Sequence, residues 1–186
     1  GRPVLPPYAI RRLGGVPVGF IGLVLKETPT IVTPSGVAGL RFLDEAETAN
    51  RYARELVARG VRAIVVLIHQ GGTQASYQGP TEAGRTLGAD FAELVSRLDG
   101  EIDVVISGHR HAFSNALAPN AAGRPVLVTQ AFSSGTAFGQ VDLEIDRASR
   151  DVVAKSASIV TTWADVSPGT TPEPGALALQ DSAMER

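Results

Sequence analysis

The chain has 186 residues, 44% of them hydrophobic, which is enough for one domain with a sizeable core but too short for two comfortable ones. Its formal net charge is -2 and it contains no long run of Lys or Arg, which argues against binding to nucleic acid polymers or anionic membranes. The absence of cysteine excludes disulfides, thiolate zinc sites and cysteine nucleophiles, so any metal must be bound by His, Asp, Glu, Asn or Gln.

No segment has the length of a membrane span. The longest strongly apolar run, residues 63–68, is far shorter than the ~20 residues that a helix needs to cross a bilayer. The first residues contain no charged segment followed by an apolar one, as a signal peptide would. We therefore expect the chain as given to be soluble, with no membrane span.

The first elements expected along the chain are a β-hairpin and a helix. Two apolar or β-branched runs, residues 8–12 and 16–25, flank a Gly-Gly pair that tolerates the positive φ angles of a tight turn. Further on, Asp44 is a suitable N-cap residue, and Glu47 completes a capping box with it. Apolar residues then recur at helical spacing, which predicts a helix.

Nearly continuous apolar runs over residues 61–68 and 102–106 predict two strands that are buried on both faces. Between them we expect a long surface loop over 73–87, where no periodicity is visible, and a short helix over 89–98. Three further strands are expected at 125–129, 139–145 and 152–162. Strands that alternate with helices and are followed by consecutive strands indicate a layered α/β sheet with an antiparallel continuation.

All three histidines of the sequence follow the two buried strands: His69 comes after the first, and His109 and His111 after the second. Ligands of open α/β sheets bind outside the carboxyl ends of the strands, and neutral imidazole is a good ligand for zinc, manganese or iron. Three imidazoles at one edge would supply half of a two-metal site. Gly108 lets the chain turn sharply, and if the turn stays extended, His109 and His111 project to the same side while Arg110 points away.

Each of these signals also has an ordinary interpretation. A lone histidine at a strand end is more often a polar side chain that bonds to the backbone, and a single Gly-His-X-His sequence has moderate specificity. Because both signals follow buried strands that end in small polar turns, we favour metal binding.

Four segments of the chain, in the same order, carry a family resemblance. They are residues 20–23 with 27–28, residues 65–71, residues 103–111 and residues 128–131. These segments resemble the calcineurin-like metallophosphoesterases, and among them the 5'-nucleotidase and UDP-sugar hydrolase family. The resemblance covers roughly residues 7–162, and the Gly-His-X-His block is its most specific part.

The resemblance implies an α/β fold, a layered metallophosphoesterase-type β-sandwich flanked by helices. It implies that His69 and His109 are ligands of the second metal, and that His111 binds the first. Two divalent ions, such as zinc, manganese or iron, would activate a bridging hydroxide that attacks the phosphorus of a nucleotide phosphate ester. A periplasmic or secreted location is implied in the same way.

The first half of such a catalytic domain carries an Asp-X-His motif, a bridging Asp and a Gly-Asn-His motif, and nothing in this sequence supplies them. We therefore expect residues 1–163 to be the C-terminal half of the domain, with the missing N-terminal half as a partner. From Ser167 the composition shifts to Pro, Gly and Thr, so residues 164–186 are expected to be a linker and the start of a helix toward an absent nucleotide-binding domain. On its own, the fragment is expected to be inactive.

Two alternatives stay open: a non-catalytic fragment or binding module that retains the fold and at most one metal, and a serine or general acid/base hydrolase without metal. The segment Ser133-Ser134-Gly135 lacks the nucleophile-elbow pattern and favours a tight connection between strands. Arg85 and Arg110 could meet phosphate, although solvated arginines are more common. Tyr77 could approach a substrate base, although packing of its loop is the commoner role.

Overall fold

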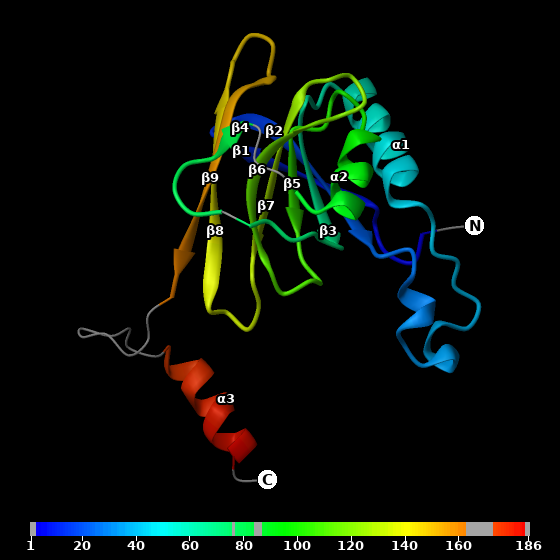
Figure 1. The fold of residues 1–186 in the computed structure, drawn as a ribbon, viewed down its shortest axis with the longest axis vertical. Coiled ribbons are helices and arrows are strands. Elements are labelled where there is room, and N and C mark those ends of the chain that lie inside the picture. Colours follow the sequence, from blue (N-terminus) through cyan, green and yellow to red (C-terminus); the bar gives the residue numbers. More distant parts are fainter. Residues whose placement is uncertain (1–2, 76, 84–86, 163–172, 185–186) are drawn as a thin grey trace.

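The structure is a computed structural model that describes residues 3–75, 77–83, 87–162 and 173–184. Figure 1 shows three layers, with a mixed sheet in the middle, two helices on one face and a long β-hairpin on the other. The central sheet contains β1 (Tyr8–Leu13), β2 (Val16–Val24), β3 (Ala63–His69), β4 (Glu82–Ala83), β5 (Val104–Ser107), β6 (Phe113–Pro119) and β7 (Pro125–Ala131). The other elements are the 3-10 helices Thr28–Thr30 and Pro34–Val37, α1 (Glu45–Ala58), α2 (Ala89–Ser96), β8 (Ala137–Ile145), β9 (Val152–Thr161) and α3 (Pro174–Met184). The layered α/β class, a sandwich of two sheets flanked by helices, is confirmed.

The strand order of the central sheet places the two histidine-bearing strands side by side. The order is β1-β2-β3-β5-β7-β6-β4, and β2, β3, β5 and β7 run parallel. Strands β1 and β6 are antiparallel to β2 and β7, respectively. Ile68 pairs with Ser107 near the ends of β3 and β5, so these strands finish at the same edge of the sheet.

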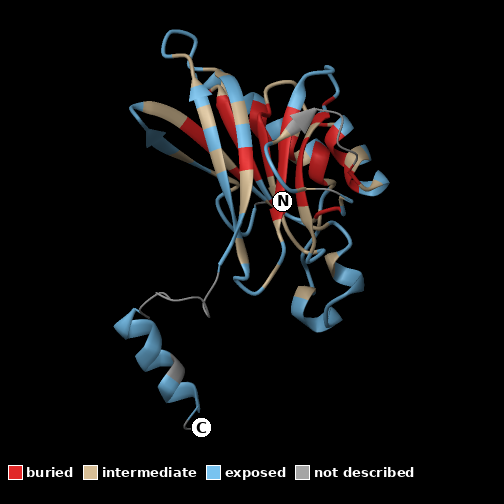
Figure 2. Ribbon diagram, turned by 60° about the vertical axis from the view of Figure 1, so that its left-hand side comes forward, coloured by how far each residue is buried: buried red, intermediate tan, exposed pale blue. Residues whose placement is uncertain are grey.

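Both faces of the central sheet are buried, which explains why β3 is apolar without alternation. Ile64 and Val66 face the helices and pack in one core cluster with residues of α1 and α2. Ala63 and Val65 face the β8–β9 hairpin and form a second cluster with Ala157. Figure 2 shows the buried residues gathered in the central strands and on the inner faces of the helices, while the hairpin and α3 are largely exposed. No helix in the described part of the chain is long and apolar enough to cross a membrane.

Helix α1 begins as the sequence predicts. The Asp44 side chain accepts a hydrogen bond from the Glu47 backbone N–H at 3.0 Å, as an N-cap should. The same carboxylate accepts a hydrogen bond at 2.6 Å from Arg97, the residue that caps the C-terminus of α2. This guanidinium holds the pKa of the Asp44 carboxyl below its ordinary value. One side chain therefore fixes the start of α1 and joins it to the end of α2.

Strand β6 is the main element that the sequence pattern does not predict. Its residues Ser114 and Asn115 are polar yet fully buried, so the apolar signature of a strand is interrupted. The Asn115 backbone N–H donates to Gln74 Oε1 at 2.8 Å, and its side-chain amide donates to the Ala157 carbonyl at 2.9 Å. The segment expected to be a loop, residues 73–87, contains the two-residue strand β4, which pairs with β6. Residues 76 and 84–86 of this segment lie outside the described part of the chain.

Asp103, which directly precedes β5, is buried. Its carboxylate accepts a hydrogen bond from the Ile64 backbone N–H at 3.0 Å and lies 3.2 Å from the Lys155 ammonium. Burial raises the pKa of this carboxyl above its ordinary value, although the Ile64 amide and Lys155 both act in the opposite direction. The ion pair ties β5 to the hairpin, at the end of the sheet opposite the histidines.

Candidate active site

His69 and His109 lie together at the carboxyl edge of the central sheet. His69 is the last residue of β3, and His109 follows β5 by two residues. Their ring centroids are 5.2 Å apart and the ring planes are inclined by 72°. Both side chains are at least partly accessible, which a ligand-binding position requires. The expected proximity of these two histidines is therefore confirmed.

Two close backbone contacts bring the histidine-bearing turns together. The Gly108 N–H donates to the Gln70 carbonyl at 3.3 Å, so the loop after β5 is bonded to the loop after β3. A side chain at Gly71 would overlap the Gly108 carbonyl oxygen and the Gln130 side chain, so only glycine fits there. Gln130 is itself buried and donates to the Ala112 carbonyl at 2.8 Å, which fixes the chain just beyond His111.

The turn that carries His109 and His111 is not extended, so the condition under which both side chains would project to the same side is not met. His109 has a φ of 72° and His111 a φ of 48°, both in the left-handed region, whereas Gly108 does not have a positive φ. The Arg110 N–H donates to the Gly108 carbonyl at 2.9 Å, and this contact closes a tight turn. Histidine adopts left-handed backbone more readily than most residues, but the conformation still carries strain. Backbone strain of this kind clusters at functional sites.

The described residues offer only part of the ligands that a metal site needs. No three His, Cys, Asp or Glu side chains in the described part of the chain converge closely enough to hold a metal. Two imidazole nitrogens bound at about 2.1 Å to one tetrahedral ion would place their ring centroids roughly 5 Å apart, close to the separation of the His69 and His109 rings. Gln70 Oε1 and Gln130 Oε1 are buried beside these turns, and neither accepts a hydrogen bond from a described residue. The edge thus offers two imidazoles and two unused oxygen acceptors.

Comparison with known proteins finds relatives that are similar to most of this chain. No model of a known protein family matches the chain. The chain is 40% identical over 160 residues to Endonuclease YhcR of Bacillus subtilis, covering 86% of this chain and 12% of that protein. It is 28% identical over 169 residues to the snake venom 5'-nucleotidase of Naja atra, covering 83% of this chain and 28% of the relative.

Solved structures with the same fold cover nearly the whole chain. A 5'-nucleotidase precursor from Thermus thermophilus superimposes with a TM-score of 0.69 and 26% identity, over 96% of this chain and 34% of that one. The calcineurin-like phosphoesterase YfkN from Bacillus subtilis superimposes with a TM-score of 0.70 and 23% identity, over 100% of this chain and 59% of that one. In sequence the chain is similar to 5'-nucleotidases, and its fold is that of 5'-nucleotidase and calcineurin-like phosphoesterase structures. The chain spans only 12% and 28% of the length of the two curated relatives named above.

Three other residues were weighed in the sequence analysis for a role at the site. Arg110 is exposed and lies 3.9 Å from the Asp90 carboxylate, so it is largely solvated. Ser133 accepts hydrogen bonds at its carbonyl from the backbone and the hydroxyl of Thr136, which is the tight connection that was expected. Arg85 lies outside the described residues.

Three features of this edge are missed by reasoning from the sequence. The packing role of Gly71 follows from contacts across the sheet, which no local pattern shows. Gln130 belongs to a segment that carries the family resemblance, but its bond to Ala112 requires the β6–β7 pairing. Phe113 and Phe132 stack beside the histidine turn, and neither belongs to a recognisable motif.

Proposed function

We propose that this chain forms the histidine-bearing half of a metal-dependent site that hydrolyses phosphate esters of nucleotides. His69 and His109 hold one divalent ion, and His111 contributes to a second. The observation that carries the proposal is the 5.2 Å separation of the His69 and His109 rings, at the adjacent ends of two parallel strands. Similarity to 5'-nucleotidases in sequence and fold supports the reaction class.

Divalent ions bound at this edge would supply Lewis-acid activation of the attacking water and of the phosphoryl group. The residues of this chain would bind the ions and hold the histidine ligands in position. The contact between Gly71 and Gly108 holds the two turns together, and the Gln130 side chain fixes the backbone that follows His111. Arg110, exposed between the two histidines of the turn, adds a positive charge near an anionic substrate.

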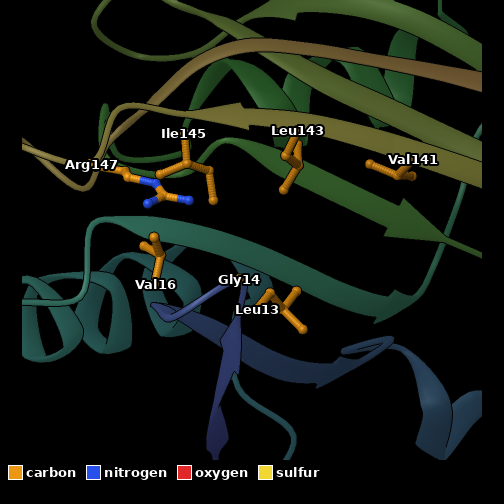
Figure 3. A pocket seen from close by; sticks show the side chains of 7 residues that line it. All are labelled: Leu13, Gly14, Val16, Val141, Leu143, Ile145 and Arg147. Carbon is orange, nitrogen blue, oxygen red and sulfur yellow. The ribbon is translucent and has the colours of Figure 1, made fainter.

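The upstream half of the catalytic domain completes the site. Three neutral imidazoles do not offset the repulsion between two divalent cations, so anionic ligands must come from sequence outside this chain. Figure 3 shows a groove between the β1–β2 turn and strand β8, with apolar side chains directed into it from both sides. Its volume is about 400 Å³, and it is lined by Leu13, Gly14, Val16, Val141, Leu143, Ile145 and Arg147. We assign this groove to strands of the upstream half.

The remaining parts of the proposal concern the protein to which the chain belongs. We place residues 1–163 in the second half of the catalytic domain, and residues 164–186 in a linker and the start of a helix toward a nucleotide-binding domain. Residues 163–172 lie outside the described part of the chain, and α3 covers Pro174–Met184. The protein is periplasmic or secreted, which agrees with the relative named from snake venom.

The test is hydrolysis by the full-length protein with manganese or zinc, before and after treatment with EDTA. Adenosine 5'-monophosphate is the first substrate, and a short oligonucleotide is the second, because the relative with 40% identity is named an endonuclease. We expect turnover of at least one substrate, its loss with EDTA, and its return on addition of the metal. The His69→Ala and His109→Ala variants should lose metal and be inactive. Arg110→Ala, a change in the same turn, should retain its metal and keep a reduced but measurable turnover, because Arg110 does not bind the ion.

Activity that survives EDTA would favour a hydrolase without metal. Folded, metal-loaded protein that hydrolyses neither substrate would favour the non-catalytic binding module. Either result contradicts the proposal, and the oligonucleotide assay also tests the expectation that nucleic acid polymers are not substrates.

A further inference from the structure

The Gln130 side chain joins three segments of the chain at the histidine edge. Gln130 lies in β7 and is only 2% exposed. Its Nε2 atom donates one hydrogen bond to the Ala112 carbonyl at 2.8 Å and another to the Gly72 carbonyl at 3.3 Å. Ala112 directly follows His111, and Gly72 belongs to the loop after β3. One amide group therefore connects β7 to both histidine-bearing loops.

The two acceptors fix the orientation of this amide. If it were turned over, its oxygen would face two carbonyl oxygens, and neither of these can donate a hydrogen bond. In the observed orientation, Oε1 lies beside Gly71, where an added Cβ would overlap it. The Gln130 side chain therefore acts as a double donor toward the two loops.

Gly72 gives this connection a firm anchor. It is buried, and a Cβ at this position would lie 2.7 Å from the Phe91 Cβ of α2. Phe91 is itself 1% exposed and belongs to the core cluster between the sheet and the helices. The Gly72 backbone is thus held against the core, and Gln130 ties Ala112 to it.

His111 depends on this connection because its backbone is strained and its side chain is exposed. Its φ of 48° lies in the left-handed region, and such a conformation persists only where the surrounding contacts determine it. The Ala112 carbonyl accepts two hydrogen bonds, one from the Gln130 side chain and one from the Phe132 N–H at 2.9 Å. Both bonds hold the residue after His111 onto β7.

The other two histidines are held by different contacts. The Gly108 N–H donates to the Gln70 carbonyl, and Gly71 packs against the Gly108 carbonyl oxygen. The two bonds of Gln130 Nε2 go to other carbonyls. The position of His111 is therefore set by one group of contacts, and the positions of the other two histidines by another.

We propose that Gln130 is a positioning residue that places His111 relative to the His69–His109 pair. This inference rests on the proposed function, in which His111 contributes to a different ion from the other two histidines. Loss of the two donor bonds should therefore weaken the binding of one ion selectively. Side chains that orient metal ligands without touching the metal typically change metal affinity by about 10- to 100-fold.

The test is titration of the full-length protein with manganese or zinc, combined with elemental analysis. Gln130→Met keeps a side chain of similar length but has no donor. We expect the Kd of the ion that His111→Ala depletes or weakens to rise about tenfold, and the Kd of the ion that His69→Ala depletes to change by less than about threefold. Gln130→Asn, whose amide is too short to reach both carbonyls, is the second variant and should weaken the same ion by a smaller factor.

Asn115→Leu is the matched control, because Asn115 is another fully buried amide, and its side chain bonds to Ala157 and Thr81 instead of to residues next to the histidines. It should lower the thermal stability, as Gln130→Met does, and leave the Kd of both ions unchanged. Equal weakening of both ions in Gln130→Met would overturn the inference, because Gln130 would then support the whole edge. Unchanged binding of both ions, or a selective loss in Asn115→Leu, would overturn it as well.

Failure of the proposed function gives a different result. If the wild type does not bind two ions, hydrogen exchange of the metal-free protein still tests Gln130. Gln130→Met should then speed exchange of the Phe132 N–H, which donates to the Ala112 carbonyl, by about tenfold and leave the Gly108 N–H unchanged. Faster exchange at both amides, or at neither, would contradict the inference.

Discussion

Gly71 packs against the carbonyl oxygen of Gly108, with no room for a side chain between the two histidine-bearing turns. Each of these glycines lies two residues or fewer from a histidine of the candidate site. The distance between the His69 and His109 rings is consequently set by backbone contact and not by the histidine side chains alone.

Gly71→Ala should therefore separate the two turns. The Cβ added at position 71 would overlap the Gly108 carbonyl oxygen, which as a backbone atom cannot rotate away. We therefore expect a loss of roughly 1–3 kcal/mol in stability, together with lower metal occupancy. Gly22→Ala is the control, because a Cβ at Gly22 in β2 meets open space. Metal content and thermal unfolding of the two full-length variants check the prediction, and equal metal content would contradict it.

The three histidines should not contribute equally to metal binding. His69→Ala and His109→Ala are expected to deplete the same ion, since their rings are adjacent. His111→Ala should deplete the other ion or only weaken it. Elemental analysis of the three purified variants gives the answer, and the assignment of His111 to a separate metal fails if all three changes empty one identical site.

The left-handed backbone of His111 predicts an unusual order of stability among its substitutions. His111→Gly should be more stable than His111→Ala by roughly 1 kcal/mol, because glycine adopts a positive φ without steric cost. At Arg110, which does not have a positive φ, the order should be reversed. Thermal unfolding of both pairs tests this, and the same order at the two positions would show that the turn adopts another conformation in solution.

Much of the fold could be predicted from the sequence because local patterns and tertiary packing agree. The apolar run of β3 and the Asp44 cap of α1 are examples. The site could be predicted only in part. The proximity of His69 and His109 follows from the ends of parallel strands, but the turn geometry depends on the Arg110 to Gly108 hydrogen bond. Strand β6 could not be predicted, because the hydrogen-bond partners of the buried Asn115 lie in distant segments of the chain.

The buried ion pair between Asp103 and Lys155 should make stability depend on pH. Lys155→Met leaves a buried carboxylate without its cation, and we expect a loss of about 3 kcal/mol at pH 7. Removing Lys155 raises further a pKa that burial already raises, so the folded state takes up a proton before the unfolded state does as pH falls. The deficit relative to wild type should therefore shrink between pH 7 and about pH 4.5.

Denaturation of the full-length variant across this range, with hydrogen exchange of the β3 and β5 amides, measures the effect. Arg54→Met is the control, since the Arg54–Asp99 pair is exposed and should contribute less than about 1 kcal/mol. A deficit that grows on acidification would contradict the sign of the predicted pKa change.

The isolated chain should bind at most one metal ion, weakly, and hydrolyse nucleotides poorly or not at all. The anionic ligands that two divalent ions require are expected from the upstream half, which we place against the groove beside β8. Assays with manganese or zinc, with and without the separately produced upstream half, check this. Restored activity on mixing is the expected result, and robust turnover by the chain alone would contradict it.

The parallel order of the central strands has a consequence for how the protein is made. Val18 pairs with Ala63, and Ile68 pairs with Ser107, so all of α1 or all of α2 lies between the partners. Pairings between such distant segments close slowly, because the chain entropy is lost before the contacts form. A nascent chain that ends before Ser107 therefore contains His69 but not His109. In the folded protein, the two histidines come together only when β3 has paired with β5.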